Sequence, residues 1–108
     1  MELNEYQIRA LSTKQYGAGA KIIYPSLKLN GEAGEVAEKV GKVLRDNNGE
    51  FSDEKKLEIA KEIGDVLWYC AALADDLACN LNTIAQMNLE KLADRRNRGV
   101  ISGSGDNR

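Results

Sequence analysis

Histidine is absent from the 108 residues of this chain, and proline occurs only once. Without histidine the protein lacks the commonest general base, the usual zinc ligand and the usual pH switch. The single proline and the small number of aromatic residues (four tyrosines, one tryptophan, one phenylalanine) favour helices over strands. Charge of one sign is not in excess either. The net charge is −2, and the basic residues form no block that would predict a nucleic-acid or anionic-membrane surface.

Long apolar segments are also missing. The longest apolar run, VLWYCAALA, is far too short to cross a bilayer, and the charged start MELNEYQIR does not resemble a signal peptide. The two cysteines, Cys70 and Cys79, fall in one predicted helix, where nine residues place them about 13 Å apart on opposite faces. This spacing excludes a disulfide within the chain, and a reduced, cytoplasmic protein is expected.

The sequence does contain helical periodicity, and no segment predicts a strand. Turn-forming residues divide the pattern into four expected helices. The first runs from an N-cap at Asn4 to Gly17, the second from Pro25 or Ser26 to about Arg45, the third from a cap at Ser52 or Asp53 to about Ala78, and the fourth from a cap at Asn80 or Asn82 to near Gly99.

The third helix has the clearest apolar pattern, with spacings that alternate between three and four as in a coiled-coil seam. Its members are Ala60, Ile63, Leu67, Cys70, Ala74, Leu77 and Leu81. The second helix carries a matching apolar arc, formed by Leu29, Ala33, Val36, Val40, Val43 and Leu44. Packing these two surfaces together predicts an all-α, antiparallel, four-helix bundle-like fold. The wide apolar arcs also leave room for dimerisation.

Two pairs of acidic residues border these apolar surfaces. Glu32 and Glu35 lie three residues apart on the second helix, as do Glu62 and Asp65 on the third. This spacing places the Cβ atoms of each pair about 5–6 Å apart on one face. If the helices pack through their apolar arcs, the pairs converge and repel unless a cation lies among them. Oxygen ligands alone select Mg²⁺ or Mn²⁺. The alternative is a solvated acidic face, with Lys39 paired to Glu35.

The chain carries a longer pattern around these acids. The segments LNGEAGEVAEKV and KEIGDVLWYCAALA resemble the MazG-type nucleotide pyrophosphohydrolases, whose signature is ExxE followed after a variable gap by ExxD. These enzymes belong to the all-α NTP pyrophosphatase superfamily. Glu32 and Glu35 match the first half of the signature, and Glu62 and Asp65 match the second. The resemblance extends over residues 25–108.

The resemblance implies hydrolysis of a nucleoside triphosphate between its α and β phosphates, which gives a monophosphate and pyrophosphate. The four carboxylates would hold Mg²⁺, or Mn²⁺ in its place, and Glu35 or Glu32 would deprotonate the attacking water. The expected role is nucleotide pool sanitation or regulation, in a homodimer or a dimer of dimers. A specificity for deoxyuridine nucleotides or phosphoribosyl-ATP stays open, and so does a non-catalytic helical interaction module.

Residues near the signature are expected to contact the nucleotide. Tyr69 follows Asp65 by one turn, so its hydroxyl could reach a phosphate; the alternative is a half-buried structural tyrosine. Trp68 could stack on a base, or belong to the core or a dimer interface. On the fourth helix, Asn88, Lys91 and Arg95 share a face. The resemblance implies nucleotide contacts there, and a capping or salt-bridging surface is the alternative.

Glycines occur in two places that bear on the site: the C-terminal tail and the second helix. Residues 1–98 are predicted to form the domain, and 99–108 a glycine-rich tail that the resemblance places over the active site, where Asp106 or Arg108 touches ligand or a partner subunit. Gly31 and Gly34 each cost the second helix about 0.5–1 kcal/mol relative to alanine. Together with Gly41 they lie opposite the apolar arc, which predicts a cleared flank beside the carboxylates for a triphosphate or for the backbone of a second subunit.

Overall fold

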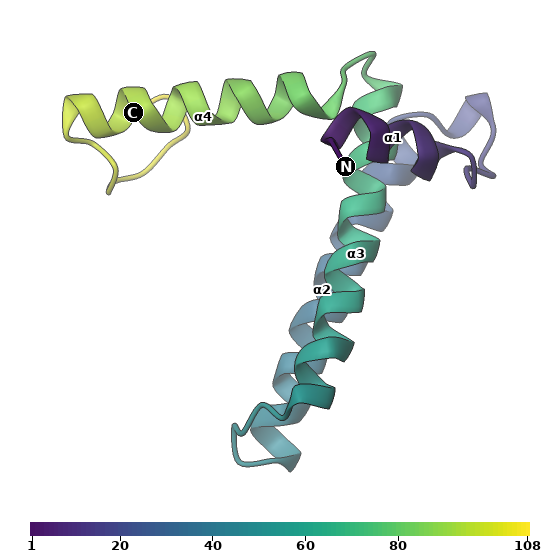
Figure 1. The fold of residues 1–108 in the computed structure, drawn as a ribbon, viewed down its shortest axis with the longest axis vertical. Coiled ribbons are helices and arrows are strands. Elements are labelled where there is room, and N and C mark those ends of the chain that lie inside the picture. The colour runs from purple at the N-terminus through teal and green to yellow at the C-terminus, as the bar shows by residue number, and fades with distance from the viewer.

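The computed structural model describes all 108 residues and is entirely helical (Figure 1). Its elements are α1 (Leu3–Leu11), the short 3-10 helix η1 (Ala18–Ala20), α2 (Ile23–Asp46), α3 (Asp53–Asp76) and α4 (Leu81–Arg98). The prediction of an all-α fold is confirmed. None of the helices combines the length and the apolar character needed to cross a lipid bilayer.

The two longest helices form an antiparallel hairpin. In Figure 1, α2 and α3 run side by side along their whole lengths, while α1 lies across the end of the hairpin that is far from the α2–α3 loop. Helix α4 leaves that same end and projects away from the hairpin. A single chain therefore presents the antiparallel pair of a bundle, with α4 standing apart from it.

A small core joins α1 to the turn between α3 and α4. Its members are Ala71, Ala74 and Leu81, with Tyr6 packed against them. The buried side chain of Gln7 supplies the polar contacts of this region. Its amide donates to the carbonyls of Ala71 at 3.1 Å and Cys79 at 3.2 Å, and its carbonyl accepts the Leu81 N–H at 3.1 Å. One amide thus pairs the Cys79 carbonyl of the α3–α4 turn and the Leu81 N–H at the start of α4.

Two predicted helix caps are confirmed. The hydroxyl of Ser52 accepts the N–H of Lys55 at 3.1 Å and starts α3. The side chain of Asn80 accepts the N–H of Thr83 at 2.8 Å and starts α4. Gly99 ends α4 in the left-handed conformation (φ 72°) that glycine adopts at low cost.

The first helix is shorter than predicted. It ends at Leu11 rather than Gly17, because the hydroxyls of Ser12 and Thr13 donate to the carbonyls of the last helical turn and close it. The predicted N-cap at Asn4 is also wrong. Its side-chain carbonyl accepts the N–H of Asn82 at 3.0 Å and so ties α1 to the start of α4. Helix α2 begins at Ile23, slightly before the predicted Pro25.

The coiled-coil seam predicted for α3 does not face α2. Ile63 and Leu77 are 55% and 51% exposed, and Leu67 is also exposed; only Ala74 and Leu81, near α1, are buried. The side of α3 that meets α2 is the neighbouring one, because Glu62 forms an ion pair with Lys39 of α2 at 3.7 Å. The apolar seam of α3 is therefore left on the surface of the single chain.

Candidate active site

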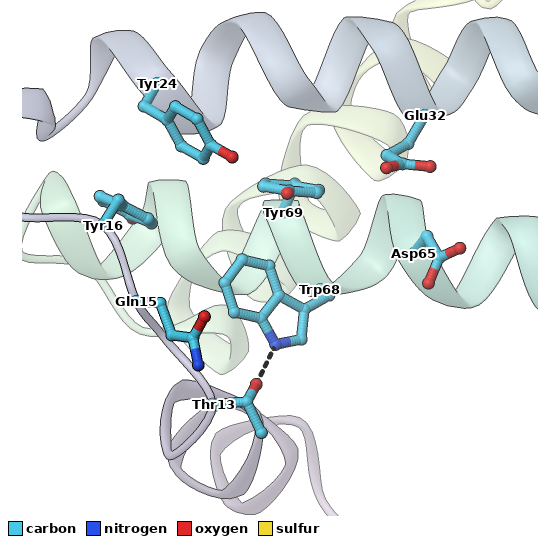
Figure 2. A pocket seen from close by; sticks show the side chains of 8 residues that line it. All are labelled: Thr13, Gln15, Tyr16, Tyr24, Glu32, Asp65, Trp68 and Tyr69. Atoms are coloured by element: carbon cyan, nitrogen blue, oxygen red, sulfur yellow. Dashed lines mark hydrogen bonds between the residues drawn. The ribbon is translucent and has the colours of Figure 1, made fainter.

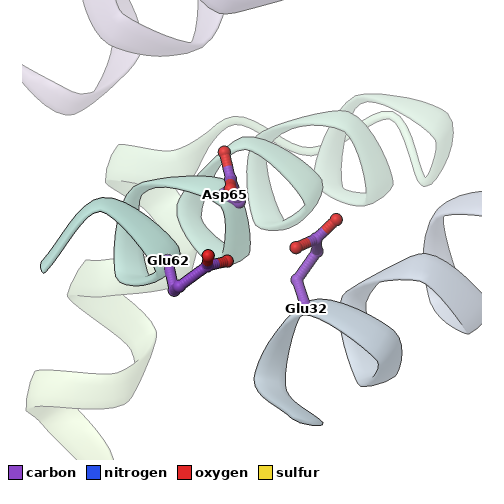
Figure 3. A group of neighbouring side chains, drawn as sticks. All are labelled: Glu32, Glu62 and Asp65. Carbon is purple, nitrogen blue, oxygen red and sulfur yellow. The ribbon is translucent and has the colours of Figure 1, made fainter. Parts of the chain in front are cut away.

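Three carboxylates meet between α2 and α3, in the middle of the hairpin. Glu32 comes from α2, and Glu62 and Asp65 come from successive turns of α3 (Figure 3). One oxygen from each carboxylate lies within 4.8 Å of the other two. Glu32 and Glu62 are half-buried and Asp65 is exposed. Octahedral Mg²⁺, with bonds of about 2.1 Å, needs ligand oxygens about 3–4 Å apart, so small side-chain rotations would complete such a site. The donor set fits a hard divalent cation.

Glu35, the fourth carboxylate of the pattern, lies outside this group. It is exposed on the next turn of α2. Its role as a metal ligand stays a prediction. Lys39 pairs with Glu62, not with Glu35 as the solvated-face alternative expected. The ammonium of Lys39 thus offsets part of the repulsion among the gathered carboxylates.

A cavity of about 540 Å³ opens beside the carboxylates (Figure 2). Its lining residues are Thr13, Gln15, Tyr16, Tyr24, Glu32, Asp65, Trp68 and Tyr69. Two members of the carboxylate group, Glu32 and Asp65, therefore form one edge of the cavity, and aromatic rings form much of the remainder. The volume is in the range of sites that bind small organic ligands. Aromatic rings beside carboxylates that fit a divalent cation suit a molecule with a planar group at one end and phosphates at the other.

The aromatic rings of the cavity hold each other in place. Trp68 and Tyr69 lie edge to face with centroids 4.8 Å apart, and Tyr24 lies 5.1 Å from Tyr16 and 6.4 Å from Tyr69. The indole N–H of Trp68 donates to the hydroxyl of Thr13 at 2.9 Å. Fixing the rings in this way lowers the entropy lost when a ligand stacks on them.

Tyr69 stays protonated over the whole physiological range. Burial raises the pKa of its hydroxyl to about 12, with further contributions from Tyr24 and from the negative charges of Glu32 and Asp65. A neutral phenol is a hydrogen-bond donor. Tyr69 can therefore donate to an anionic ligand placed beside the carboxylates.

The segment between α1 and α2 closes one side of the cavity. A single residue near the end of α3, Asp76, holds it. Its carboxylate accepts from the ammonium of Lys14 at 3.0 Å, from the hydroxyl of Tyr16 at 2.8 Å and from the N–H of Ile22 at 2.9 Å. The side chain is completely buried. Burial alone would raise the pKa of Asp76, but these three donors outweigh it and the pKa is lowered.

The sequence patterns do not predict this side of the cavity. Gln15 and Tyr16 fall within the helix that the sequence predicts up to Gly17, whereas α1 ends at Leu11 and leaves both in the connecting segment; Tyr24 lies just before the predicted start of the second helix. Asp76 follows Asp65 by eleven residues, about three turns, and so shares its face of α3. That spacing was a usable signal, although it does not reveal the partners of Asp76.

The predicted nucleotide contacts on α4 lie away from this cavity in the single chain. Asn88 is exposed, and Lys91 and Arg95 bind the tail. The ammonium of Lys91 donates to the carboxylate of Asp106 at 2.6 Å, and Arg95 donates to the same carboxylate at 3.2 Å. Both cations lower the pKa of Asp106. Arg95 and Arg98 of α4 also donate to the backbone carbonyls of Asp106 and Arg108, so the tail folds back on α4. The side chain of Arg108 donates to carbonyls within the tail. Contact of these residues with nucleotide stays a prediction.

Comparison with known protein families decides the relationship. Residues 26–100 match the MazG nucleotide pyrophosphohydrolase domain. The chain belongs to the MazG family. It is also similar to the Gene 37 protein of Mycobacterium phage L5, with 47% identity over 114 aligned residues that span both chains completely. A comparison with solved structures finds no match.

The MazG match divides the candidate site in two. All members of the carboxylate group lie within the matched residues, together with Trp68 and Tyr69. Thr13, Gln15, Tyr16 and Tyr24 precede them, and Asp106 follows them. The carboxylate side of the cavity is thus the part this chain has in common with the MazG domain, and the opposite wall is built by residues outside it.

Proposed function

We propose that this MazG protein is a Mg²⁺-dependent nucleoside triphosphate pyrophosphohydrolase. It cleaves an NTP or dNTP between the α and β phosphates and releases a nucleoside monophosphate and pyrophosphate. The observation that carries the proposal is that one cavity is lined by two kinds of side chain: the carboxylates of Glu32 and Asp65 form its edge, and the remainder is rich in aromatic rings. A nucleotide presents the same two kinds of group, a planar base and a polyphosphate.

Glu32, Glu62 and Asp65 would hold Mg²⁺, or Mn²⁺ in its place, and Glu35 would join them after a change of side-chain rotamer. These carboxylates would hold the ion where its charge would neutralise phosphate oxygens and acidify a water that it coordinates. The chain itself supplies the general base. Glu35 or Glu32 takes the proton as the water oxygen forms its bond to the α phosphorus and the bond to the bridging oxygen of pyrophosphate breaks.

The cavity would orient the nucleotide for this attack. The neutral hydroxyl of Tyr69 donates to a phosphate oxygen, which compensates negative charge without a second cation. The base stacks among the rings of Trp68, Tyr16 and Tyr24, an interaction worth about 1–3 kcal/mol per base. Holding both ends fixes the scissile bond beside the carboxylates.

The active form is proposed to be a homodimer or a dimer of dimers. Helix α4 has few contacts in the single chain, yet carries exposed apolar side chains: Ile84, Met87, Leu89 and Leu92. The exposed seam of α3 is a second such surface. In an assembly that covers both, Asn88, Lys91 and Arg95, with Asp106 and Arg108 of the tail, would reach a nucleotide held by another copy. The cellular role we propose is nucleotide pool sanitation or regulation in the cytoplasm.

A panel of substrates tests the proposed function. The folded protein is incubated with Mg²⁺ and each canonical ribonucleoside and deoxyribonucleoside triphosphate, dUTP and phosphoribosyl-ATP, and pyrophosphate release is measured. We expect release from at least one triphosphate and none after Mg²⁺ is chelated. A folded protein that releases pyrophosphate from none of them, and binds Mg²⁺ no better with nucleotide than without it, would instead be a helical interaction module.

A further inference from the structure

The wall of the cavity that lies outside the MazG match contains a strained turn. Ile22 has φ 67° and ψ −54°, and the N–H of Ile23 donates to the carbonyl of Lys21 at 2.7 Å. These features define a γ-turn of the rare type, which is costly for a β-branched residue such as isoleucine. Such a conformation persists only where surrounding contacts hold it.

Asp76 supplies those contacts. One of its carboxylate oxygens accepts both the N–H of Ile22 and the hydroxyl of Tyr16, and the other accepts the ammonium of Lys14. The three donors come from the same short segment between α1 and α2. A buried carboxylate with three charge-assisted or polar donors is among the strongest hydrogen-bond arrangements available to a protein. One residue of α3 therefore fixes the start, the middle and the end of that segment.

The held segment faces the cavity directly. Tyr16 lies between Lys14 and Tyr24, with its ring 4.7 Å from the ammonium of Lys14 and 5.1 Å from the ring of Tyr24. Gln15 also lines the cavity, and its side-chain amide makes no hydrogen bond within the chain (Figure 2). An amide has both donors and an acceptor, as the edge of a nucleobase does. Gln15 is solvent-exposed, so its amide next to these rings is free to bond to the edge of a base.

We propose that Asp76 is a positioning residue for nucleotide recognition: through Lys14, Tyr16 and the turn at Ile22 it sets the wall of the cavity on which Tyr16 stacks with the base and Gln15 reads its edge. This inference rests on the proposed function, because it takes a nucleotide as the ligand. Asp76 itself does not line the cavity and touches neither ligand nor metal. It acts through the segment that it holds, so its loss should change nucleotide affinity and selectivity more than the chemical step.

Two variants and a matched control test the role of Asp76. Tyr16→Phe removes one hydrogen bond to Asp76 and keeps the ring, and Asp76→Asn weakens all three contacts. Asp75→Asn makes the same change of charge at the neighbouring residue, whose half-exposed side chain approaches only Lys14, at the 4.0 Å limit of an ion pair, and accepts no hydrogen bond from Tyr16 or Ile22. The probes are the α,β-methylene analogues of ATP, GTP, CTP and UTP with Mg²⁺. Binding is followed by the fluorescence of Trp68, the single tryptophan, which borders the cavity. The emission maximum of the free protein reports on the environment of that ring.

We expect Tyr16→Phe and Asp76→Asn to weaken binding of the preferred analogue about tenfold and to reduce discrimination among the four. KM should rise with kcat little changed, the emission of Trp68 should shift, and Mg²⁺ affinity without nucleotide should stay the same. Asp75→Asn should behave like the wild type. Gln15→Ala should reduce discrimination while leaving the emission of Trp68 unchanged.

Two negative results are distinguishable. If the wild type binds the analogues and both variants bind them equally well with unchanged Trp68 emission, the positioning role is wrong and the proposed function stands. If the wild type binds none of these analogues, and none of the corresponding deoxyribonucleotide analogues, the proposed function fails, and with it the ligand assumed for Asp76. Should Asp76→Asn fail to fold, Tyr16→Phe decides alone, because it leaves the ion pair between Lys14 and Asp76 in place.

Discussion

Asp75 and Asp76 are neighbours in the sequence with opposite surroundings. The side chain of Asp75 is half exposed and lies 4.0 Å from Lys14, at the limit of an ion pair, whereas that of Asp76 is fully buried and has three donors. The lowered pKa of Asp76 therefore links its ionisation to folding. Two adjacent carboxylates thus differ completely in burial and in hydrogen bonding.

This difference predicts an acid-dependent stability. The pKa of Asp76 is lower in the folded chain than in the unfolded chain, where it is about 3.9. Its contribution to the free energy of unfolding is therefore fully present above about pH 3.9 and is lost as the pH falls through the folded pKa. Asp76→Asn should lower the free energy of unfolding by about 3 kcal/mol at pH 7. In denaturant titrations the difference in the free energy of unfolding between this variant and the wild type should shrink below about pH 4. An equal gap at pH 3 and pH 7 would contradict the assignment.

A second prediction at the residue scale concerns Glu62. Glu62→Gln should lower turnover at least about 100-fold, since loss of even an outer partner of a metal ligand costs 10–100-fold. Thermal stability should hardly change, because the variant loses a partly exposed ion pair with Lys39 but relieves repulsion within the carboxylate group. Turnover and melting temperature are measured side by side.

The control for Glu62 is Glu58→Gln, one turn earlier on α3. Glu58 pairs with Lys55 and is not part of the carboxylate group. It should keep wild-type turnover. Equal activity of Glu62→Gln and the wild type would remove Glu62 from the site.

At the scale of the helix, the glycines of α2 have open space around them. A Cβ added at Gly34 would meet no atom within 4 Å in the single chain. Gly34→Ala should therefore stabilise α2 by about 0.5–1 kcal/mol. If the cleared flank serves a triphosphate or a second subunit, the same change should weaken turnover or assembly. Denaturation, steady-state kinetics and sedimentation measure the three effects.

Gly41→Ala is the matched control, because Gly41 is also open in the single chain but lies two turns further from Glu32. It should stabilise the helix and leave turnover and assembly unchanged. If Gly34→Ala behaves in the same way, the cleared flank has no function and the glycine only weakens the helix.

The tail behaves as an element of its own. It is held by Lys91 and Arg95 through Asp106, whose side chain is 75% exposed, so water and salt compete for the contact. Asp106→Asn should release residues 102–108, which NMR relaxation would show as lower heteronuclear NOE values in the tail alone. Glu90→Gln, which changes an exposed hydrogen bond with Gln86 on the same helix and keeps Asp106, should leave the tail ordered. A tail equally ordered in both variants would show that other contacts hold it.

The whole molecule is too open for a protein of its size. Its radius of gyration is 16.8 Å, against about 13 Å for a compact chain of 108 residues. Its accessible surface is 7636 Å², against about 5,900 Å² for a compact 11.9 kDa monomer. Only 8 of 108 residues are buried. A hairpin and a projecting helix with so small a core need a further surface to pack against.

Charge placed on the exposed seam tests this expectation. Leu67→Lys on α3 should shift the wild-type oligomer to an 11.9 kDa monomer in light scattering and lower its stability, because it puts an ammonium in the proposed interface. Glu54→Lys, on another face of α3, should leave the mass unchanged. A monomeric wild type would contradict the proposed assembly directly.

Local signals in the sequence predicted the helices well and their packing less well. Caps at Ser52 and Asn80 and the stop at Gly99 are local interactions, and the structure confirms them. The end of α1 and the face of α3 that meets α2 depend on contacts with distant residues. A seam of apolar spacing shows that a helix has a partner, but it does not show which chain provides that partner.

The sequence by itself determined the all-α class, the limits of three of the four helices and the pairs of acids at i and i+3, because helix geometry fixes what lies one turn away. Only the tertiary structure decided that Glu32 joins Glu62 and Asp65 while Glu35 stays outside, and that Asp76 fixes the wall with Tyr16. The contacts of Glu32 with the acids of α3, and of Asp76 with Tyr16, join residues more than 25 positions apart. The packing of α2, α3 and the segment before α2 decides which of these residues meet.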